Sequence, residues 1–367
     1  MDNEELAAWL RLQLTAGVGN ETARRLLTAF GLPGNIWNQS FSAWQTVTNA
    51  KTARALQSMP SALSAAVKRL SEWLDESPAH HLVTLADARY PAALLNTADP
   101  PLMLYLRGCP EVLTHARKLA IVGSRNPTPQ GEANARQFAR SLTQSGLCVV
   151  SGLALGVDGA AHAGALEAGG PTIAVVGTGL DTVYPQRHAP LATHIAENGL
   201  IVSEYPLGTP PLAAHFPQRN RIIAGLCQGT LVVEAAVKSG SLITARCAAE
   251  QGREVFAIPG SIHAPQSRGC HALIRQGAKL VESAQDILED LQVVDKVEKL
   301  DEPATNRLST PGDDLLEAMG HDPVGLDALQ ARTGLETATL QARLLELELD
   351  GQVSRMPGGL LQRVSTG

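Results

Sequence analysis

The residues best suited to chemistry lie in one short stretch, where an aromatic side chain and two arginines stand at the start of an apolar run. Phe216 is followed by Arg219, Asn220 and Arg221, and residues 222–226 continue what reads as a helix. Arginine side chains hold phosphate groups, and an aromatic ring can stack on a base. The stretch therefore favours contact with a nucleic-acid strand over bond cleavage in a small metabolite.

Two other turns carry groups that bind phosphate. The first, at residues 123–125, ends an apolar strand, and the second, at residues 238–241, opens a helix that also contains a threonine. Backbone N–H groups at a helix start form an anion site, which small hydroxyls and a nearby cation would reinforce. The candidate DNA-binding residues of these two turns are Gly123, Ser124, Arg125, Lys238, Ser239, Gly240, Ser241 and Thr244.

Each of these residues also has a purely structural interpretation. The hydroxyls of the second turn could cap their own helix, and the two arginines could be solvated or paired with Glu204 or Glu234. Phe216 could be a packed loop anchor. However, Phe138 and Phe256 fit core positions of the same region, which leaves Phe216 as the expected base-stacking residue.

Charge and cysteine content narrow the class of protein. The 367 residues carry a net charge of −6, but residues 311–367 hold nine acidic against four basic side chains, so much of the excess lies at the C-terminal end. The five cysteines are widely spaced and predict neither a disulfide framework nor a zinc site. An acidic N-terminus and the lack of a long apolar run predict a cytoplasmic protein without a membrane segment.

Short apolar runs alternate with helical stretches over residues 118–293. This pattern predicts an α/β fold with a doubly wound parallel sheet, in an extended Rossmann-like arrangement. Ligands of such sheets bind at the carboxyl ends of the strands. The expected strands are Leu119–Val122, Leu147–Val150, Thr172–Val176, Leu200–Ser203, Thr230–Val233, Glu254–Ile258 and Lys279–Val281.

Two helical regions are expected to flank this sheet domain. Residues 1–80 predict a SAM-like or helix-hairpin-helix-like domain with a Gly17-Val18-Gly19 turn, and residues 81–117 read as a connecting arm. Residues 294–313 are charged and contain two prolines, which is typical of a linker. Three short helices and a hairpin over residues 314–367 predict a winged-helix domain.

The candidate recognition helix of the winged-helix domain is acidic. It carries Glu346, Glu348 and Asp350 against a single Arg343. Because like charges repel, this helix should avoid the phosphates of duplex DNA. Contact with another protein is therefore the favoured role of this domain.

Enzymatic interpretations find less support. No dinucleotide-binding GxGxxG follows the first strand, and no Walker A lysine motif is present. The alternative is a nucleoside-monophosphate phosphoribohydrolase of the lysine-decarboxylase-like Rossmann group, because Gly229-Thr230 with Glu234 matches part of that signature. Cys227 and Gln228 replace its preceding glycines. We expect no catalytic residue, cofactor or metal.

Six motifs, in order along the chain, closely resemble the DNA-processing protein A (DprA/Smf) family. They are Ala120–Arg125, Ser151–His162, Val175–Pro185, Ser203–Pro206, Phe216–Gly225 and Ser239–Ala245. The resemblance runs from about residue 90 to 291. It implies a bacterial protein that binds incoming single-stranded DNA in natural transformation, forms a homodimer through the sheet domain and helps to load the RecA recombinase.

The resemblance also carries over a DNA site. It implies contacts from Ser124 and Arg125, stacking on Phe216, and further contacts from the two arginines beside it and from the Lys238 turn. The chain departs from the family pattern at Leu155, where many members have a basic or polar residue, and at His271, where asparagine is usual.

Overall fold

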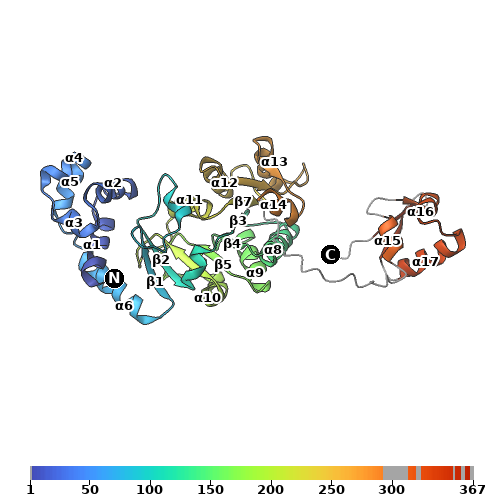
Figure 1. Cartoon of the computed structure of the whole chain (residues 1–367), viewed down its shortest axis with the longest axis horizontal. Coiled ribbons are helices and arrows are strands. Elements are labelled where there is room, and N and C mark those ends of the chain that lie inside the picture. The colour runs from blue at the N-terminus through green and yellow to red at the C-terminus, as the bar shows by residue number, and fades with distance from the viewer. Residues whose placement is uncertain (1, 292–312, 320–323, 350–351, 357–359, 364–367) are drawn as a thin grey trace, which may run out of the picture. The chain divides into compact units, whose positions relative to one another are not determined.

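The computed structural model describes residues 2–291, 313–319, 324–349, 352–356 and 360–363. These form two compact units, Met1–Val294 and Asp295–Gly367, which are considered separately (Figure 1). Within the described residues, no helix combines the length and apolar character needed to cross a bilayer.

A nine-stranded sheet forms the centre of the first unit. Its order is β1-β2-β6-β5-β4-β3-β7-β8-β9, in which β1 and β2 are antiparallel to their neighbours and all other pairs are parallel. The strands are β1 His80–Thr84, β2 Met103–Gly108, β3 Lys118–Val122, β4 Cys148–Ser151, β5 Thr172–Val175, β6 Leu200–Ser203, β7 Gly229–Val232, β8 Glu254–Ala257 and β9 Lys279–Leu280. All seven predicted strands are therefore present.

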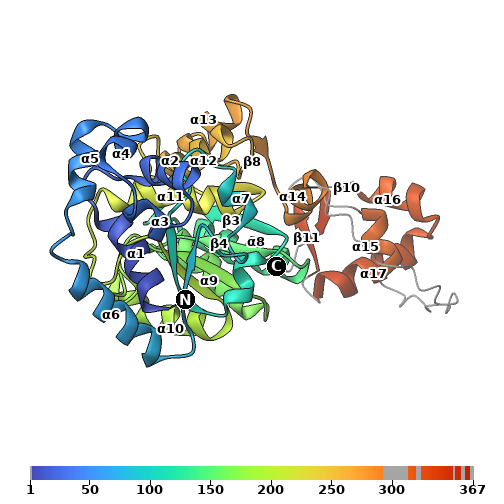
Figure 2. The ribbon, with the colours of Figure 1, turned by 60° about the vertical axis from the view of Figure 1, so that its left-hand side comes forward.

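Both faces of the parallel part are covered by helices, which explains the continuous apolar runs (Figure 2). In β3, Leu119 and Ile121 pack with α8 and α9, whereas Ala120 and Val122 pack with α11 and α12 on the other face. The helices of this region are α7 Ala92–Leu95, α8 Pro129–Gln144, α9 Val157–Glu167, α10 Ala189–Asn198, α11 His215–Leu226, α12 Ser241–Glu250, α13 Arg268–Arg275 and α14 Ala284–Asp290, with short 3-10 turns at Pro110–Thr114, Gln186–His188 and Pro265–Ser267.

Residues 81–117, expected to be a connecting arm, extend the sheet instead. β1 pairs with β2, and β2 pairs antiparallel with β6, so that the chain covers what would otherwise be an open sheet edge. The polar residues His80 and His81 at the start of β1 leave only a short apolar run in that strand.

Six helices precede the sheet: α1 Asn3–Leu14, α2 Asn20–Phe30, α3 Pro33–Trp37, α4 Phe41–Val47, α5 Ala50–Gln57 and α6 Leu63–Glu76. Their core contains the buried Trp9, Trp44 and Trp73 and continues without a break into Met103 and Tyr105 of β2. The N-terminal helices thus share a hydrophobic core with the sheet.

The chain reverses its direction of winding between β3 and β7. Strands β4, β5 and β6 are added on one side of β3, after which the chain crosses over to β7, β8 and β9 on the other side. In open α/β sheets such a switch point leaves a crevice at the carboxyl ends of the strands, where ligands bind.

The second unit has the winged-helix arrangement. It contains α15 Asp313–Met319, α16 Leu326–Thr333 and α17 Thr337–Leu349, with a sheet of order β10-β12-β11 formed by Val324–Gly325, Leu360–Arg363 and Val353–Met356. Leu329, Leu340 and Leu344 are buried in its core. Nearly all of the predicted linker at 294–313 lies outside the described residues.

Candidate nucleic-acid interface

One pocket at the carboxyl edge of the sheet gathers eleven of the twelve predicted DNA-binding residues. Its volume is about 540 Å³, and it lies between the ends of β3 and β4, the first turns of α11, and the loop from β7 into α12. The lining residues are Val122, Gly123, Ser124, Arg125, Asn126, Ala154, Asp158, Phe216, Pro217, Arg219, Asn220, Ile223, Ala236, Lys238, Ser239, Gly240, Ser241 and Thr244. The three predicted turns thus surround one cavity at the switch point.

The turn after β3 combines an anchored serine with an exposed arginine. The Ser124 N–H donates to the Glu234 carbonyl at 2.7 Å, and Ser124 Oγ accepts from the Asn126 N–H at 3.1 Å. The guanidinium carbon of Arg125 lies 5.6 Å from the centroid of the Phe216 ring, within range of a cation–π attraction. The turn therefore presents a cation beside an aromatic ring at the pocket wall.

Phe216 lies in the first turn of α11, and its neighbours fix the start of this helix. His215 stacks on Tyr205 with ring centroids 4.1 Å apart, and His215 Nδ1 lies 3.2 Å from the Gly177 carbonyl oxygen. A Cβ at Gly177 would lie 3.3 Å from the Phe216 ring, so the end of β5 approaches the ring closely. The ring is half-buried and has a defined position.

The start of α12 uses part of its polar groups for local contacts. Ser239 Oγ lies 2.7 Å from Ser241 Oγ and accepts from the Ser241 N–H at 3.4 Å, whereas Gly240 at the N-cap offers no side chain to the helix. Asn220 Nδ2 donates to the Gly240 carbonyl at 3.3 Å and joins α11 to this turn. Lys238 is exposed. The turn therefore combines hydroxyls that contact each other with an accessible cation.

Arg219 is buried at the bottom of the pocket, with 4% of its surface exposed. Its Nη1 donates to the carbonyls of Gly152 and Val175, at the ends of β4 and β5, and its Nε donates to Asn220 Oδ1 at 2.9 Å. Burial lowers the pKa of Arg219 to about 10, an effect that the Asp158 carboxylate opposes, so the side chain stays cationic at neutral pH. Arg219 thus joins two strand ends and adds positive potential under the pocket.

Asp158 lies beside Arg219 at the start of α9. Its Oδ2 accepts from the N–H groups of Gly152 and Ala154 at 3.1 and 3.3 Å. Burial raises the pKa of Asp158, whereas Arg219 and the two N–H donors lower it. A Cβ at Gly152 would lie 2.2 Å from Arg219 Nη2, so a glycine here leaves room for the buried guanidinium.

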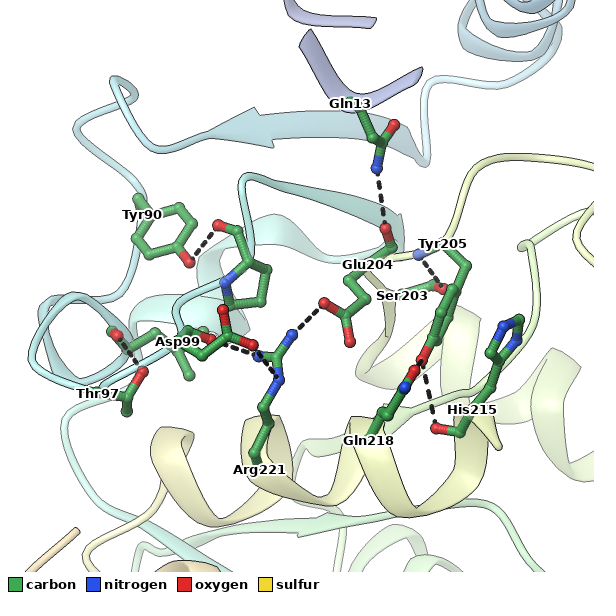
Figure 3. A network of polar contacts seen from close by, with 12 residues as sticks. Gln13, Tyr90, Thr97, Asp99, Ser203, Glu204, Tyr205, His215, Gln218 and Arg221 are labelled. Carbon is green, nitrogen blue, oxygen red and sulfur yellow. Dashed lines mark hydrogen bonds and ion pairs between the residues drawn. The ribbon is translucent and has the colours of Figure 1, made fainter. Parts of the chain in front are cut away.

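Arg221 is the one predicted DNA-binding residue that does not line the pocket. Its side chain lies beside Asp99 and Glu204 (Figure 3). Residues two apart on a helix face different directions, so Arg221 points away from the side that Arg219 occupies. Its Nη1 donates to the Asp99 carbonyl at 2.7 Å, its Nε lies 3.1 Å from Asp99 Oδ2, and its Nη2 pairs with Glu204. Two carboxylates thus engage the Arg221 guanidinium, and a DNA contact from this residue stays a prediction.

The Arg221 network reaches the N-terminal helices through Gln13 of α1 (Figure 3). Gln13 Nε2 donates to the Glu204 carbonyl at 3.1 Å, and Gln13 Oε1 accepts from the Tyr105 hydroxyl at 3.0 Å. Burial raises the pKa of Glu204, whereas the Arg221 cation lowers it. The network therefore joins α1, β2 and α11 around the Glu204 carboxylate, whose burial is partly offset by the Arg221 cation.

Glu234, the carboxylate of the phosphoribohydrolase alternative, holds the start of α8. Its Oε2 accepts from the Thr128 N–H at 2.9 Å, and its Oε1 accepts from the Thr128 hydroxyl at 2.5 Å. A Cβ at Gly131 would lie 2.3 Å from the Glu234 carboxyl carbon. The carboxylate is thus enclosed by α8 and is not among the residues that line the pocket.

Comparison with known proteins identifies the family of the chain. The profile of the family described as DNA recombination-mediator protein A matches residues 81–292, and that of the DprA winged helix domain matches residues 299–359. The chain belongs to the DNA recombination-mediator protein A family. This agrees with the resemblance drawn from the six motifs.

Relatives in the DNA recombination-mediator protein A family cover most of the chain. Protein Smf of Escherichia coli is 46% identical over 297 residues, 79% of both chains. The X-ray structure of DNA processing protein A from Streptococcus pneumoniae matches with a TM-score of 0.67 and 38% identity, covering 79% of this chain and 98% of that one. The Helicobacter pylori structure, reported for its single-stranded DNA binding mode, has a TM-score of 0.53, 34% identity and coverages of 58% and 96%.

The structure also places residues beside the site that the sequence analysis did not select. Asp158 and Asn126 line the pocket, and Tyr184 lies next to Phe216. Sequence features could have pointed to two of them, because Asp158 is an acidic residue within an apolar motif and Tyr184 follows a predicted strand. The two departures from the family pattern, Leu155 and His271, do not line the pocket.

We expect Arg221→Met to destabilise the fold, because it leaves the Glu204 carboxylate buried without its cation. The loss of unfolding free energy should be about 3 kcal/mol at pH 8, as for other broken buried ion pairs. The folded pKa of Glu204 should rise further above its unfolded value, so stability is lost as pH rises through this range and the deficit shrinks toward pH 5. Urea unfolding at both pH values measures this.

The double variant Arg221→Met/Glu204→Gln is the matched control. It removes the titrating carboxylate, so its stability deficit should be smaller and should change less between pH 5 and pH 8. A deficit in the single variant that is equal at both pH values would show that packing, and not the buried charge, is responsible.

Proposed function

We propose that the chain binds single-stranded DNA without sequence preference in natural transformation, protects the incoming strand and loads the RecA recombinase, without catalysis. The observation that carries this proposal is the placement of Arg125, Phe216 and Lys238 around one pocket at the switch point. Family membership and the single-stranded DNA binding reported for the Helicobacter pylori relative support it.

The mechanism rests on charge and stacking. Arg125 and Lys238 are exposed and would neutralise backbone phosphates, while the buried Arg219 adds a fixed positive potential behind them. Phe216 would stack one base through its π-face, which all bases share. Such contacts read the backbone and the stacking surface, so little sequence preference is expected.

The proposed partners extend beyond DNA. We propose a homodimer through the sheet domain and delivery of the bound strand to RecA, as the family resemblance implies. The winged-helix unit would contact protein rather than duplex DNA, because α17 presents Glu346 on its exposed surface and carries Glu348 in the same stretch. We further propose that the protein acts in the cytoplasm.

The phosphoribohydrolase alternative has a structural objection. That interpretation needs the Glu234 carboxylate at a substrate, yet both of its oxygens accept hydrogen bonds from Thr128 at the start of α8. A carboxylate in this position stabilises the N-terminus of a helix. The structure therefore supports binding over hydrolysis.

We expect the full chain to bind an oligo-dT strand more tightly than a duplex of equal length at the same salt concentration. Phe216→Ala should weaken binding to the single strand by about 1–3 kcal/mol, because it removes the stacking surface. Fluorescence anisotropy with labelled oligonucleotides measures both effects. Equal affinity for the two forms, together with an unaffected Phe216→Ala variant, would refute the proposal.

Arg125→Ala and Lys238→Ala should each reduce the salt dependence of binding. Each phosphate contact contributes about −0.7 to the slope of log K against log salt on a single strand, so each variant should show a slope smaller by about that amount. Arg140→Ala is the matched control, because Arg140 is exposed on α8 and does not line the pocket. Slopes that change equally in all three variants would argue for non-specific attraction instead.

Incubation with nucleoside monophosphates should release no free base, because the Glu234 carboxylate is enclosed by α8. Chromatography of the reaction mixture measures this directly. Thr128→Ala loosens the same helix start while keeping the carboxylate and serves as the control for Glu234→Gln. Base release that is lost in Glu234→Gln but kept in Thr128→Ala would establish hydrolysis and overturn this part of the proposal.

A further inference from the structure

Tyr184 lies beside the pocket but outside its lining. It follows β5, and its ring centroid is 5.4 Å from that of Phe216, with an angle of 37° between the planes. The side chain is 44% exposed, which is unusual for a large aromatic residue in this domain, since Phe138, Tyr205 and Phe256 are buried or half-buried. Tyr184 therefore places a second accessible aromatic ring next to the proposed stacking residue Phe216.

The loop that carries Tyr184 is held in place by polar contacts. Thr178 Oγ1 donates to the Thr182 carbonyl at 3.2 Å, and Asp181 Oδ1 accepts from the Gly208 N–H at 2.8 Å. Tyr184 also borders a small apolar cavity together with Leu153 and other side chains. These contacts hold the Tyr184 loop in place but leave part of the Tyr184 ring accessible to solvent.

The order of the strands places Tyr184 at the end of a row of candidate contacts. Lys238 follows β7, Arg125 follows β3 and Tyr184 follows β5, and the sheet order here is β5-β4-β3-β7. Neighbouring strands are about 4.8 Å apart, so the row spans roughly 14 Å along the sheet edge. The Phe216 ring lies close to two members of this row, because its centroid is 5.6 Å from the Arg125 guanidinium carbon and 5.4 Å from the Tyr184 ring centroid.

We propose that a single DNA strand runs along this edge from the Lys238 turn to Tyr184, and that Tyr184 stacks the base next to the one on Phe216. The proposal rests on the proposed function and deepens it by assigning a second stacking position. Successive bases on successive aromatic rings are a common means of binding single strands without sequence preference. The cations would hold the backbone on the β3 and β7 side, and the rings would hold the bases on the β5 side.

The test is an anisotropy titration of the full chain with oligo-dT strands of increasing length. Tyr184→Ala should weaken binding roughly 5- to 150-fold for strands that reach both rings, since stacking on one aromatic ring has that effect. The loss should disappear for the shortest strands, which occupy the pocket and Phe216 alone. Tyr184→Phe keeps the π-face and should retain wild-type affinity at every length.

Control measurements separate this proposal from the proposed function. Met59→Ala removes another exposed apolar side chain, in the loop between α5 and α6, and should leave binding unchanged. If Phe216→Ala weakens binding while Tyr184→Ala does not, the second stacking position is refuted and the proposed function stands. If the wild-type chain fails to bind single strands, the proposed function itself fails. A loss that Tyr184→Phe does not restore would also overturn the stacking role.

Discussion

A buried arginine at the switch point of the sheet is the constraint around which the proposed binding edge is built. Arg219 joins the carbonyl ends of β4 and β5, touches Asn220 on its own helix and lies beside the buried Asp158. Desolvating a guanidinium is costly, and these partners compensate it. The cation therefore fixes α11 over the strand ends, which in turn places Phe216 and the start of α12. Arg219 thus joins the strand ends and also lies at the proposed binding pocket, so a change at Arg219 should disturb both.

Much of the fold could be predicted because the sheet is buried on both faces. Strands such as β3 and β5 read as continuous apolar runs, and the turns that follow them contain the glycine, serine and charged residues of a ligand edge. β1 escaped prediction because its first residues are histidines, and its position depends on antiparallel pairing with β2, which no local pattern shows. Short helices of the N-terminal region, such as α3, are also hard to predict. α3 spans only five residues, too few for a periodic pattern to emerge.

The candidate site could also be predicted only in part from the sequence. Residue types identified three turns at strand ends, and the shared sheet edge brings them together. Residue types alone could not separate Arg219 from Arg221, because the difference depends on the phase of α11 and on the partners of Arg221. One of these partners, Asp99, is 122 residues away in the sequence. Tyr184 likewise gains its meaning only from its distance to Phe216. Contacts across long sequence separations thus decide which polar residue faces the pocket.

The shared core of the N-terminal helices and the sheet has a consequence for how this chain could be divided. Leu10 and Trp9 of α1 belong to the same cluster as Tyr105 and Ile201 in the strands, and Gln13 adds polar contacts across that boundary. A shortened chain starting at β1 would expose this apolar surface to water, which favours self-association. The N-terminal helices therefore shield apolar side chains on one side of the sheet from water. Substitutions in these helices should be compatible with the strand residues that they pack against.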